Sequence, residues 1–203
     1  MHNRSGDYDL LCGTMNVAKH ITISGDWNVE TFVNGVFRQN AHLAIHQQNG
    51  RAVLVDPGGS AEEIGDRISE VADSLDAILL THGHFDHVGA VDALAERFGL
   101  RALAHVGDRA LIRQASIYAF RLAKRGMRPP VRIDYFEGVP TFELAGESWR
   151  TLSAAGHTDG SVCFEARGIL FTGDALFFQA IPPATYPGSD QSAICAAVGE
   201  GAC

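Results

Sequence analysis

Four side chains that commonly bind metal ions lie close together in the middle of the chain: His82, His84, Asp86 and His87. On an extended segment, residues two apart point the same way, so His82 and His84 can hold one ion between them. Asp86 and His87 follow where the chain turns, and they can face a second ion or a bound water. Neutral imidazole and carboxylate ligands suit Zn²⁺, Fe²⁺ or Mn²⁺. The spacing therefore predicts a metal site rather than a solvated polar loop.

Two later segments carry further potential ligands. His157 lies in a glycine-flanked loop between two expected strands, and Asp174 follows Thr172 and Gly173 at the end of another. Each signal is weak alone, because histidines in loops and aspartates in turns are common. Together with the first segment, they supply a further histidine and a carboxylate that can bridge two ions.

The elements that must position these side chains are predicted from hydrophobic periodicity and turn residues. Helices are expected over about 60–73, 88–98 and 107–125, with a helix-like stretch over 190–198. Ser60 and Glu63 form a capping-box pattern at the start of the first helix, and Gly99 should end the second. A hairpin turn is expected at Arg167 and Gly168. Strands are expected over 20–24, 30–36, 41–46, 51–55, 76–80, 101–105, 131–135, 140–144, 148–153, 161–166 and 168–172.

Composition limits the class of protein. The 203 residues, 46% of them hydrophobic, suffice for one domain with a sizeable core, expected over 20–203 after a polar lead-in over 1–19. A net charge of -8 argues against nucleic-acid binding. No apolar run approaches the roughly 20 residues that span a bilayer, and the polar start does not resemble a secretory signal. Four cysteines without a C-x-x-C pair indicate reduced thiols and a cytoplasmic protein.

The chain resembles the metallo-β-lactamase-fold superfamily, whose signature H-x-H-x-D-H appears here as segment 82–87. His157 and Asp174 match the later histidine and the bridging aspartate of that family. Within the superfamily, the chain looks most like the glyoxalase II-like hydroxyacylglutathione hydrolases, and the resemblance covers about residues 38–195. The shared flanking segments are 55–59, 80–84, 156–158 and 172–177.

The resemblance implies an α+β fold, the αββα sandwich, in which two mixed β-sheets carry helices on their outer faces. It also implies two metal ions per subunit, Zn²⁺ first, with Fe²⁺ or Mn²⁺ as alternatives. Asp174 would bridge the two ions, and a metal-activated water would attack a carbonyl group, first of all that of a thioester. The first site would hold His82, His84 and His157, and the second Asp86 and His87.

Two aspartates have expected roles beside the metals. Asp86 is the candidate catalytic side chain, which would orient the attacking water or move its proton. Asp56 is expected to hydrogen-bond a metal-bound histidine and fix its tautomer, and the alternative is a turn-forming Asp-Pro-Gly.

The expected substrate is a small molecule, an anionic thioester. The sequence leaves open whether the chain forms a homodimer. A run of basic side chains could attract such an anion, or could simply form a solvated helix face. Its members are Arg109, Arg113, Arg121, Lys124, Arg125, Arg128 and Arg132.

One part of the family pattern is missing, since no histidine follows His157, whereas the family supplies one in a Gly-His-Gly-type loop near its C-terminus. We therefore expect a truncated domain without its last strand and metal-ligand loop. The alternatives are a short variant with a weak second site, or completion by another group such as Cys195, Cys203, Asp190, Glu200 or the terminal carboxylate. The competing functions are a mononuclear iron persulfide dioxygenase, a lactonase or β-lactamase, and an inactive truncated member.

Overall fold

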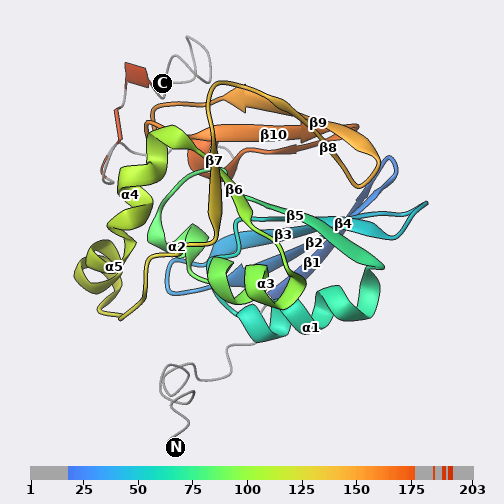
Figure 1. The fold of residues 1–203 in the computed structure, drawn as a ribbon, viewed down its shortest axis with the longest axis horizontal. Helices are drawn as coiled ribbons and strands as arrows, with labels where there is room; N and C mark the ends of the chain where they lie inside the picture. The colour runs from blue at the N-terminus through green and yellow to red at the C-terminus, as the bar shows by residue number, and fades with distance from the viewer. Residues whose placement is uncertain (1–17, 177–184, 186–188, 191, 194–203) are drawn as a thin grey trace, which may run out of the picture.

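Two β-sheets stack face to face, and helices cover the larger sheet and one end of the stack (Figure 1). The computed structural model describes residues 18–176, 185, 189, 190, 192 and 193. The first sheet has the strand order β1-β2-β3-β4-β5-β6-β7, antiparallel from β1 to β4 and parallel from β4 to β7. Its strands are β1 (Ala18–Ser24), β2 (Trp27–Asn34), β3 (Gln39–His46), β4 (Arg51–Val55), β5 (Ser74–Leu79), β6 (Ala102–His105) and β7 (Ile133–Phe136).

The second sheet is a smaller antiparallel meander in the order β11-β10-β9-β8. The fold-class prediction is confirmed, although only the first sheet is mixed. The hairpin turn at Arg167 and Gly168 is also confirmed, since Ala166 pairs with Ile169 across it. The strands are β8 (Thr141–Leu144), β9 (Glu147–Ser153), β10 (Val162–Ala166) and β11 (Ile169–Phe171).

The central strands are buried on both faces, because each face contributes to a different core. On β3, Leu43 and Ile45 pack toward α1 (Ala61–Val71) and α3 (Val91–Phe98), which lie beneath the first sheet in Figure 1. Ala44, between them, faces the second sheet and its Trp149 and Phe164. This explains the uninterrupted apolar runs Leu43–Ile45 on β3 and Ala52–Val55 on β4, where polar and apolar residues do not alternate.

Two helix predictions are wrong in detail. Ser60 takes a left-handed conformation (φ 53°) and its side chain makes no cap hydrogen bond, so the capping box does not form. The long helix expected over 107–125 is broken, because Gln114 leaves helical geometry and Lys124 ends the last turn at φ 55°. Gly99 ends α3 at φ 68°, as expected. The pieces are η1 (Val106–Asp108), α4 (Arg109–Arg113), α5 (Ala115–Tyr118) and a π-helical turn, η2 (Ala119–Ala123).

The parallel pairing of β4 with β5 determines where the polar segments meet. Val55 pairs with Leu79, so Asp56 and Thr81 leave the sheet at the same edge. Short helices follow there, α2 (Phe85–Val88) after β5 and η3 (Gly173–Ala175) after β11. None of the helices in the described ranges is both long and apolar enough to cross a membrane. The predictions for residues 1–17, and most of those beyond 176, fall on residues outside the described ones.

Candidate metal centre

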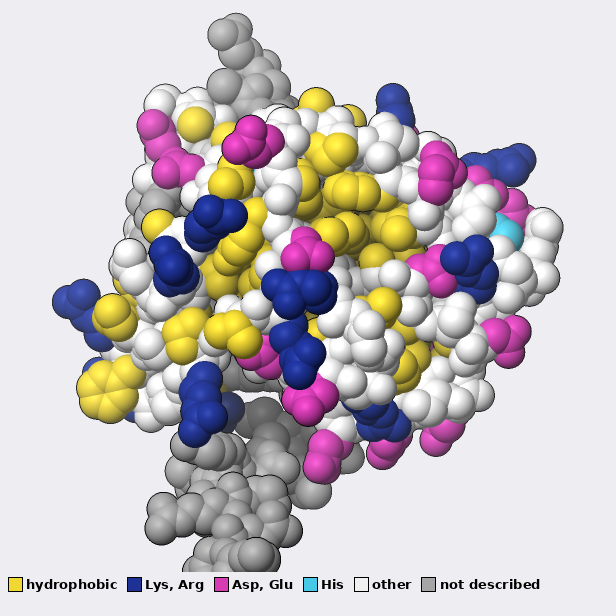
Figure 2. Space-filling model, viewed as in Figure 1, with side chains coloured by type: hydrophobic (Ala, Val, Ile, Leu, Met, Phe, Trp, Pro, Cys, Tyr) yellow, Lys and Arg dark blue, Asp and Glu magenta, His cyan; other side chains and the backbone are white. Residues whose placement is uncertain are grey.

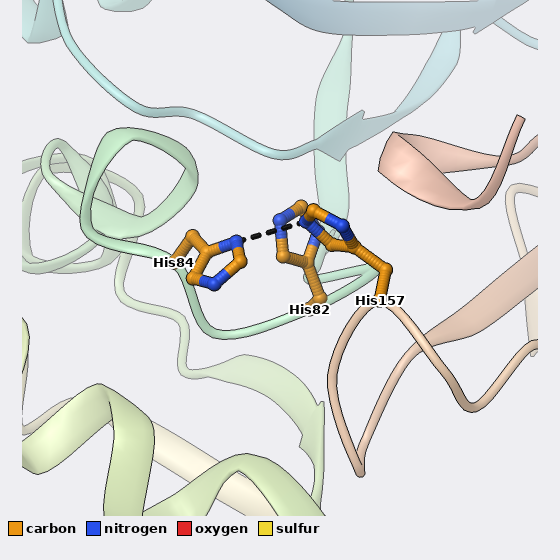
Figure 3. Close-up of side chains that lie close together, drawn as sticks. All are labelled: His82, His84 and His157. Carbon is orange, nitrogen blue, oxygen red and sulfur yellow. Dashed lines mark hydrogen bonds between the residues drawn. The ribbon is translucent and has the colours of Figure 1, made fainter. Parts of the chain in front are cut away.

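Three histidines from two distant segments converge at this edge (Figure 3). His82 and His84 come from the loop after β5, and His157 comes from the loop between β9 and β10. One ring nitrogen from each lies within 4.8 Å of the others, and all three residues are buried. His157 Nε2 and His84 Nδ1 are 2.9 Å apart. The structure thus brings together the three side chains predicted to form the first site.

Asp174 lies between this group and His87. One of its carboxylate oxygens is 3.5 Å from His87 Nε2, and the other is 3.6 Å from His157 Nε2. The carboxylate therefore faces one histidine with each oxygen, which is the arrangement that a bridging ligand requires.

Asp56 organises the side of the cluster away from Asp174. Its Oδ2 accepts a hydrogen bond from the Thr81 hydroxyl at 2.5 Å and lies 3.1 Å from His87 Nδ1. Its Oδ1 accepts the Thr81 amide at 2.8 Å. Thr81 Oγ1 is in turn 3.0 Å from His82 Nδ1. These contacts leave the Nε2 atoms of His82 and His87 as the ones that face the centre.

Asp86 reaches the cavity but is placed differently from the histidines. It lines the cavity beside His87, and neither cluster of three potential ligand atoms found among the described residues of this edge includes it. The second such cluster is Asp56, His82 and His87. The structure therefore places all the predicted site residues at one edge, where Asp56, His84, Asp86, His87 and Asp174 line the cavity.

Asp108 is a buried residue that the sequence analysis missed. Its carboxylate accepts the Gly83 amide at 2.7 Å, the Thr158 hydroxyl at 2.7 Å and the Gly160 amide at 2.8 Å. It therefore joins the two loops that carry His84 and His157. Gly83 has to be glycine, since a Cβ there would lie 2.8 Å from Ile112 and 3.0 Å from the Asp108 side chain. No signal along the chain marks Asp108, because its partners are 25 and 50 residues away.

The buried charges set the protonation of the metal-free site. Burial lowers the pKa of His82, and it lowers that of His157 to about 3, with neighbouring histidines adding to both effects. Burial also lowers the pKa of His87, but the hydrogen bond and charge of Asp56 outweigh it and raise that pKa to about 9. Burial raises the pKa of Asp174 against the opposing charge of His87. His82 and His157 are therefore neutral at pH 7, the state in which imidazole binds metals.

The donor set fits a divalent cation. The Nε2 atoms of His82 and His87 are buried and have no hydrogen-bond partner among the described residues. A buried polar atom without a partner is costly, and a bound ion removes that cost. Imidazole nitrogens with carboxylates are the ligands of zinc and of non-haem iron.

A cavity of about 600 Å³ opens beside the cluster. Phe37, Tyr118, Leu122 and Leu176 supply apolar wall, and Arg38 is the one Lys or Arg among the described residues that line it. None of the seven basic residues between Arg109 and Arg132 is part of this lining.

Figure 2 shows hydrophobic side chains over α5, where Ile117 and other apolar residues are exposed.

Comparisons with known proteins concern the family and the fold. The family model for the metallo-beta-lactamase superfamily matches residues 34–194. Hydroxyacylglutathione hydrolase GloC of Haemophilus influenzae is 32% identical over 84% of this chain and 82% of its own length. A crystal structure of the B3 metallo-beta-lactamase BLEG-1 superposes with a TM-score of 0.78 at 28% identity, covering 85% of this chain and 84% of that one. The crystal structure of TTHA1623 in a di-iron-bound form superposes with a TM-score of 0.69 at 32% identity, and the match covers 82% of each chain.

Proposed function

Because the chain belongs to the metallo-beta-lactamase superfamily, we propose that it is a metal-dependent hydrolase that cleaves acyl thioesters of an anionic thiol such as glutathione. The observation that carries the proposal is the Asp174 carboxylate, which faces His87 with one oxygen and His157 with the other. This geometry supports a two-ion centre. The name of the Haemophilus relative supports hydroxyacylglutathione as the substrate class.

The residues proposed to hold the first ion are His82, His84 and His157, and those for the second are His87 and Asp86, with Asp174 shared. Zn²⁺ is the first candidate, and Fe²⁺ or Mn²⁺ suits the same donors. A divalent ion held by these residues would supply Lewis acidity, which activates water as a nucleophile near neutral pH and polarises a carbonyl group.

The protein's own side chains supply the rest of the chemistry. Asp86 lines the cavity beside His87, so its carboxylate can orient the attacking water and accept its proton. Asp56 and Thr81 hold His87 and His82 by their Nδ1 atoms. Fixing one nitrogen sets the tautomer and aims the other at the centre.

Arg38, rather than the basic run between Arg109 and Arg132, is the side chain proposed to attract an anionic substrate, because it lines the cavity. Arg38 follows Phe37 in the β2–β3 turn and has a left-handed backbone (φ 55°). Its guanidinium can pair with a substrate carboxylate, while Phe37, Tyr118 and Leu122 can contact the acyl group.

Assays of the protein loaded separately with Zn²⁺, Fe²⁺ and Mn²⁺ test this proposal. S-lactoylglutathione should be hydrolysed by at least one form, chelation should abolish turnover, and re-addition of metal should restore it. Absence of thioester hydrolysis in forms shown to contain metal would contradict the proposal. Oxygen uptake with glutathione persulfide would identify a dioxygenase instead, and turnover of a lactone or β-lactam alone would identify those hydrolases.

Replacing Arg38 tests the substrate class separately. Arg38→Gln should raise KM for S-lactoylglutathione about tenfold, the loss of roughly one charged hydrogen bond. It should leave the KM for a neutral N-acetylcysteamine thioester unchanged. Arg150→Gln, in a surface ion pair with Glu165 on the second sheet, is the matched control. An equal effect of Arg38→Gln on both substrates would contradict recognition of the anion.

A further inference from the structure

A second group of potential ligands lies at the opposite end of the β-sandwich, and we call it the far-end cluster. It consists of Asp26 in the turn between β1 and β2, His46 at the end of β3, and Glu147 at the start of β9. His42 lines the cavity beside the candidate metal centre, which we call the catalytic cavity. It is four residues before His46 on the same strand, or about 13 Å along it. The far-end cluster is therefore separate from the candidate metal centre.

His46 is the unusual member of this cluster. It is only 5% exposed, and its ring packs edge-on against Trp27 with the ring centroids 5.1 Å apart. Neither of its ring nitrogens has a hydrogen-bond partner among the described residues. Burying an imidazole with both nitrogens unsatisfied is unfavourable, so a group that binds one of them is expected.

The spacing around His46 matches that of metal ligands. His46 Nε2 lies 3.5 Å from Glu147 Oε1, yet the pair does not form a hydrogen bond. Two ligands that are each about 2.0–2.1 Å from a tetrahedral zinc ion lie about 3.4 Å apart. One ligand atom from each of Asp26, His46 and Glu147 lies within 4.8 Å of the other two. A single ion can therefore contact all three after small adjustments.

The surroundings of Asp26 orient its carboxylate. Its Oδ1 accepts a hydrogen bond from Gln48 Nε2 at 3.0 Å, and its backbone carbonyl accepts the Gln47 amide at 2.8 Å. Arg167 is the nearby cation, with Nη1 3.7 Å from Asp26 Oδ2, and its side chain is 74% exposed. Two carboxylates with one loosely held cation leave net negative charge for a divalent ion to neutralise.

We propose that Asp26, His46 and Glu147 form a second metal site for a zinc-type divalent cation, with water as the fourth ligand. His46 belongs to the first sheet, Asp26 to the turn between two of its strands, and Glu147 to the second sheet. A bound ion therefore cross-links the two sheets at the end opposite the catalytic cavity. Its role is structural, and it stabilises the folded chain by binding it in preference to the unfolded chain.

Zinc content measured after equilibrium dialysis tests the site. Glu147→Gln and Asp26→Asn keep the shape of each side chain but remove its charge, and each should lower zinc content by one equivalent relative to the wild type. Glu143→Gln, an exposed residue on the neighbouring strand β8, is the matched control and should not change it. Zinc at 100 times its dissociation constant should raise the wild-type melting temperature by about 5–10 °C more than that of either variant.

Fluorescence locates the ion within the molecule. The chain has two tryptophans, Trp27 and Trp149, whose rings lie 5.3 Å apart, and Trp27 also contacts His46. Co²⁺ quenches nearby tryptophans, so a quenching component should disappear in Glu147→Gln and Asp26→Asn. The same component should persist in Asp174→Asn, which alters only the edge that carries the candidate metal centre, called here the catalytic edge.

Two outcomes would overturn the proposal. One is equal zinc content and equal Co²⁺ quenching in the wild type and in both carboxylate variants. The other is a Glu147→Gln protein whose melting temperature falls by the same amount with and without zinc, since His46 and Glu147 would then form only an ion pair. Melting curves without zinc show that the variants are folded before either result is interpreted.

Discussion

The two ends of the β-sandwich both bury histidines beside carboxylates, but they support them differently. At the catalytic edge, Asp56 and Thr81 contact the Nδ1 atoms of His87 and His82. At the far end, His46 has no hydrogen bond at either nitrogen among the described residues. The first arrangement aims histidines before any ion binds, as catalysis requires, whereas the second depends on the ion itself. The difference teaches that supporting contacts, more than ligand type, separate a candidate catalytic centre from a candidate structural one.

The largest expected effect comes from Asp174, the carboxylate that lies near both His87 and His157 in the candidate metal centre. Asp174→Asn should lower kcat/KM by about 10³-fold, since it removes a charge that holds the ions and costs several kcal/mol of transition-state stabilisation. Metal content at the catalytic edge should fall as well, and both are measured on the same preparation. Asp159→Asn, an exposed charge two residues after His157, is the control. Full activity in Asp174→Asn would remove the basis for a shared carboxylate.

The next effect tests whether support around the histidines matters in its own right. Asp56→Asn should weaken metal binding at the catalytic edge by about 10–100-fold, because His87 and Thr81 lose their shared anionic acceptor. Metal-buffered titrations measure the change. Zinc binding at the far-end cluster should not change, and an equal loss at both ends would contradict the comparison.

Removing the buried link between the two histidine loops should reduce stability. Asp108→Ala leaves the amides of Gly83 and Gly160 and the Thr158 hydroxyl without their acceptor, which should lower the free energy of unfolding by about 2–4 kcal/mol. Urea unfolding measures this loss. Asp66→Ala, whose side chain is 70% exposed, should change stability by less than about 0.5 kcal/mol. A similar result for both variants would show that Asp108 is dispensable.

The smallest expected effect is the pH dependence of the metal-free protein. Burial lowers the pKa of three histidines in the folded chain below the usual 6.5: His42, His82 and His157. Their contribution to the free energy of unfolding is therefore present above pH 6.5 and is lost as the pH falls. His87 has the opposite sign, because Asp56 raises its folded pKa to about 9 despite burial. The contribution of His87 to the free energy of unfolding is fully present below pH 6.5 and is lost as the pH rises through about 9.

Stability of the metal-free chain should therefore peak near pH 6.5 and decline on both sides. Urea unfolding at about pH 5, 6.5 and 9 measures the curve. His87→Gln should remove much of the decline on the alkaline side. An unchanged alkaline decline in that variant would assign it to other groups.

The fold was largely predictable where local pattern and burial agree. The short apolar runs within β3, β4 and β5 come from strands with a core on each face, so their positions follow from the local sequence pattern. Predictions failed where the backbone departs from the helical geometry that the local pattern favours. Ser60 matched a capping box but takes a left-handed conformation, and Gln114 interrupts a helix that periodicity extended.

By itself, the sequence determined the metal-binding character of this protein. His82, His84, Asp86 and His87 follow a buried strand within six residues of one another. This spacing indicates a metal site, because it gathers imidazole and carboxylate ligands at one point of the chain. Only the tertiary structure decided which side chains support them and which basic side chain lines the cavity. Asp108, Arg38 and the far-end cluster depend on contacts between residues far apart in the chain. Such contacts form when the two sheets stack, so no short sequence motif marks the residues that make them.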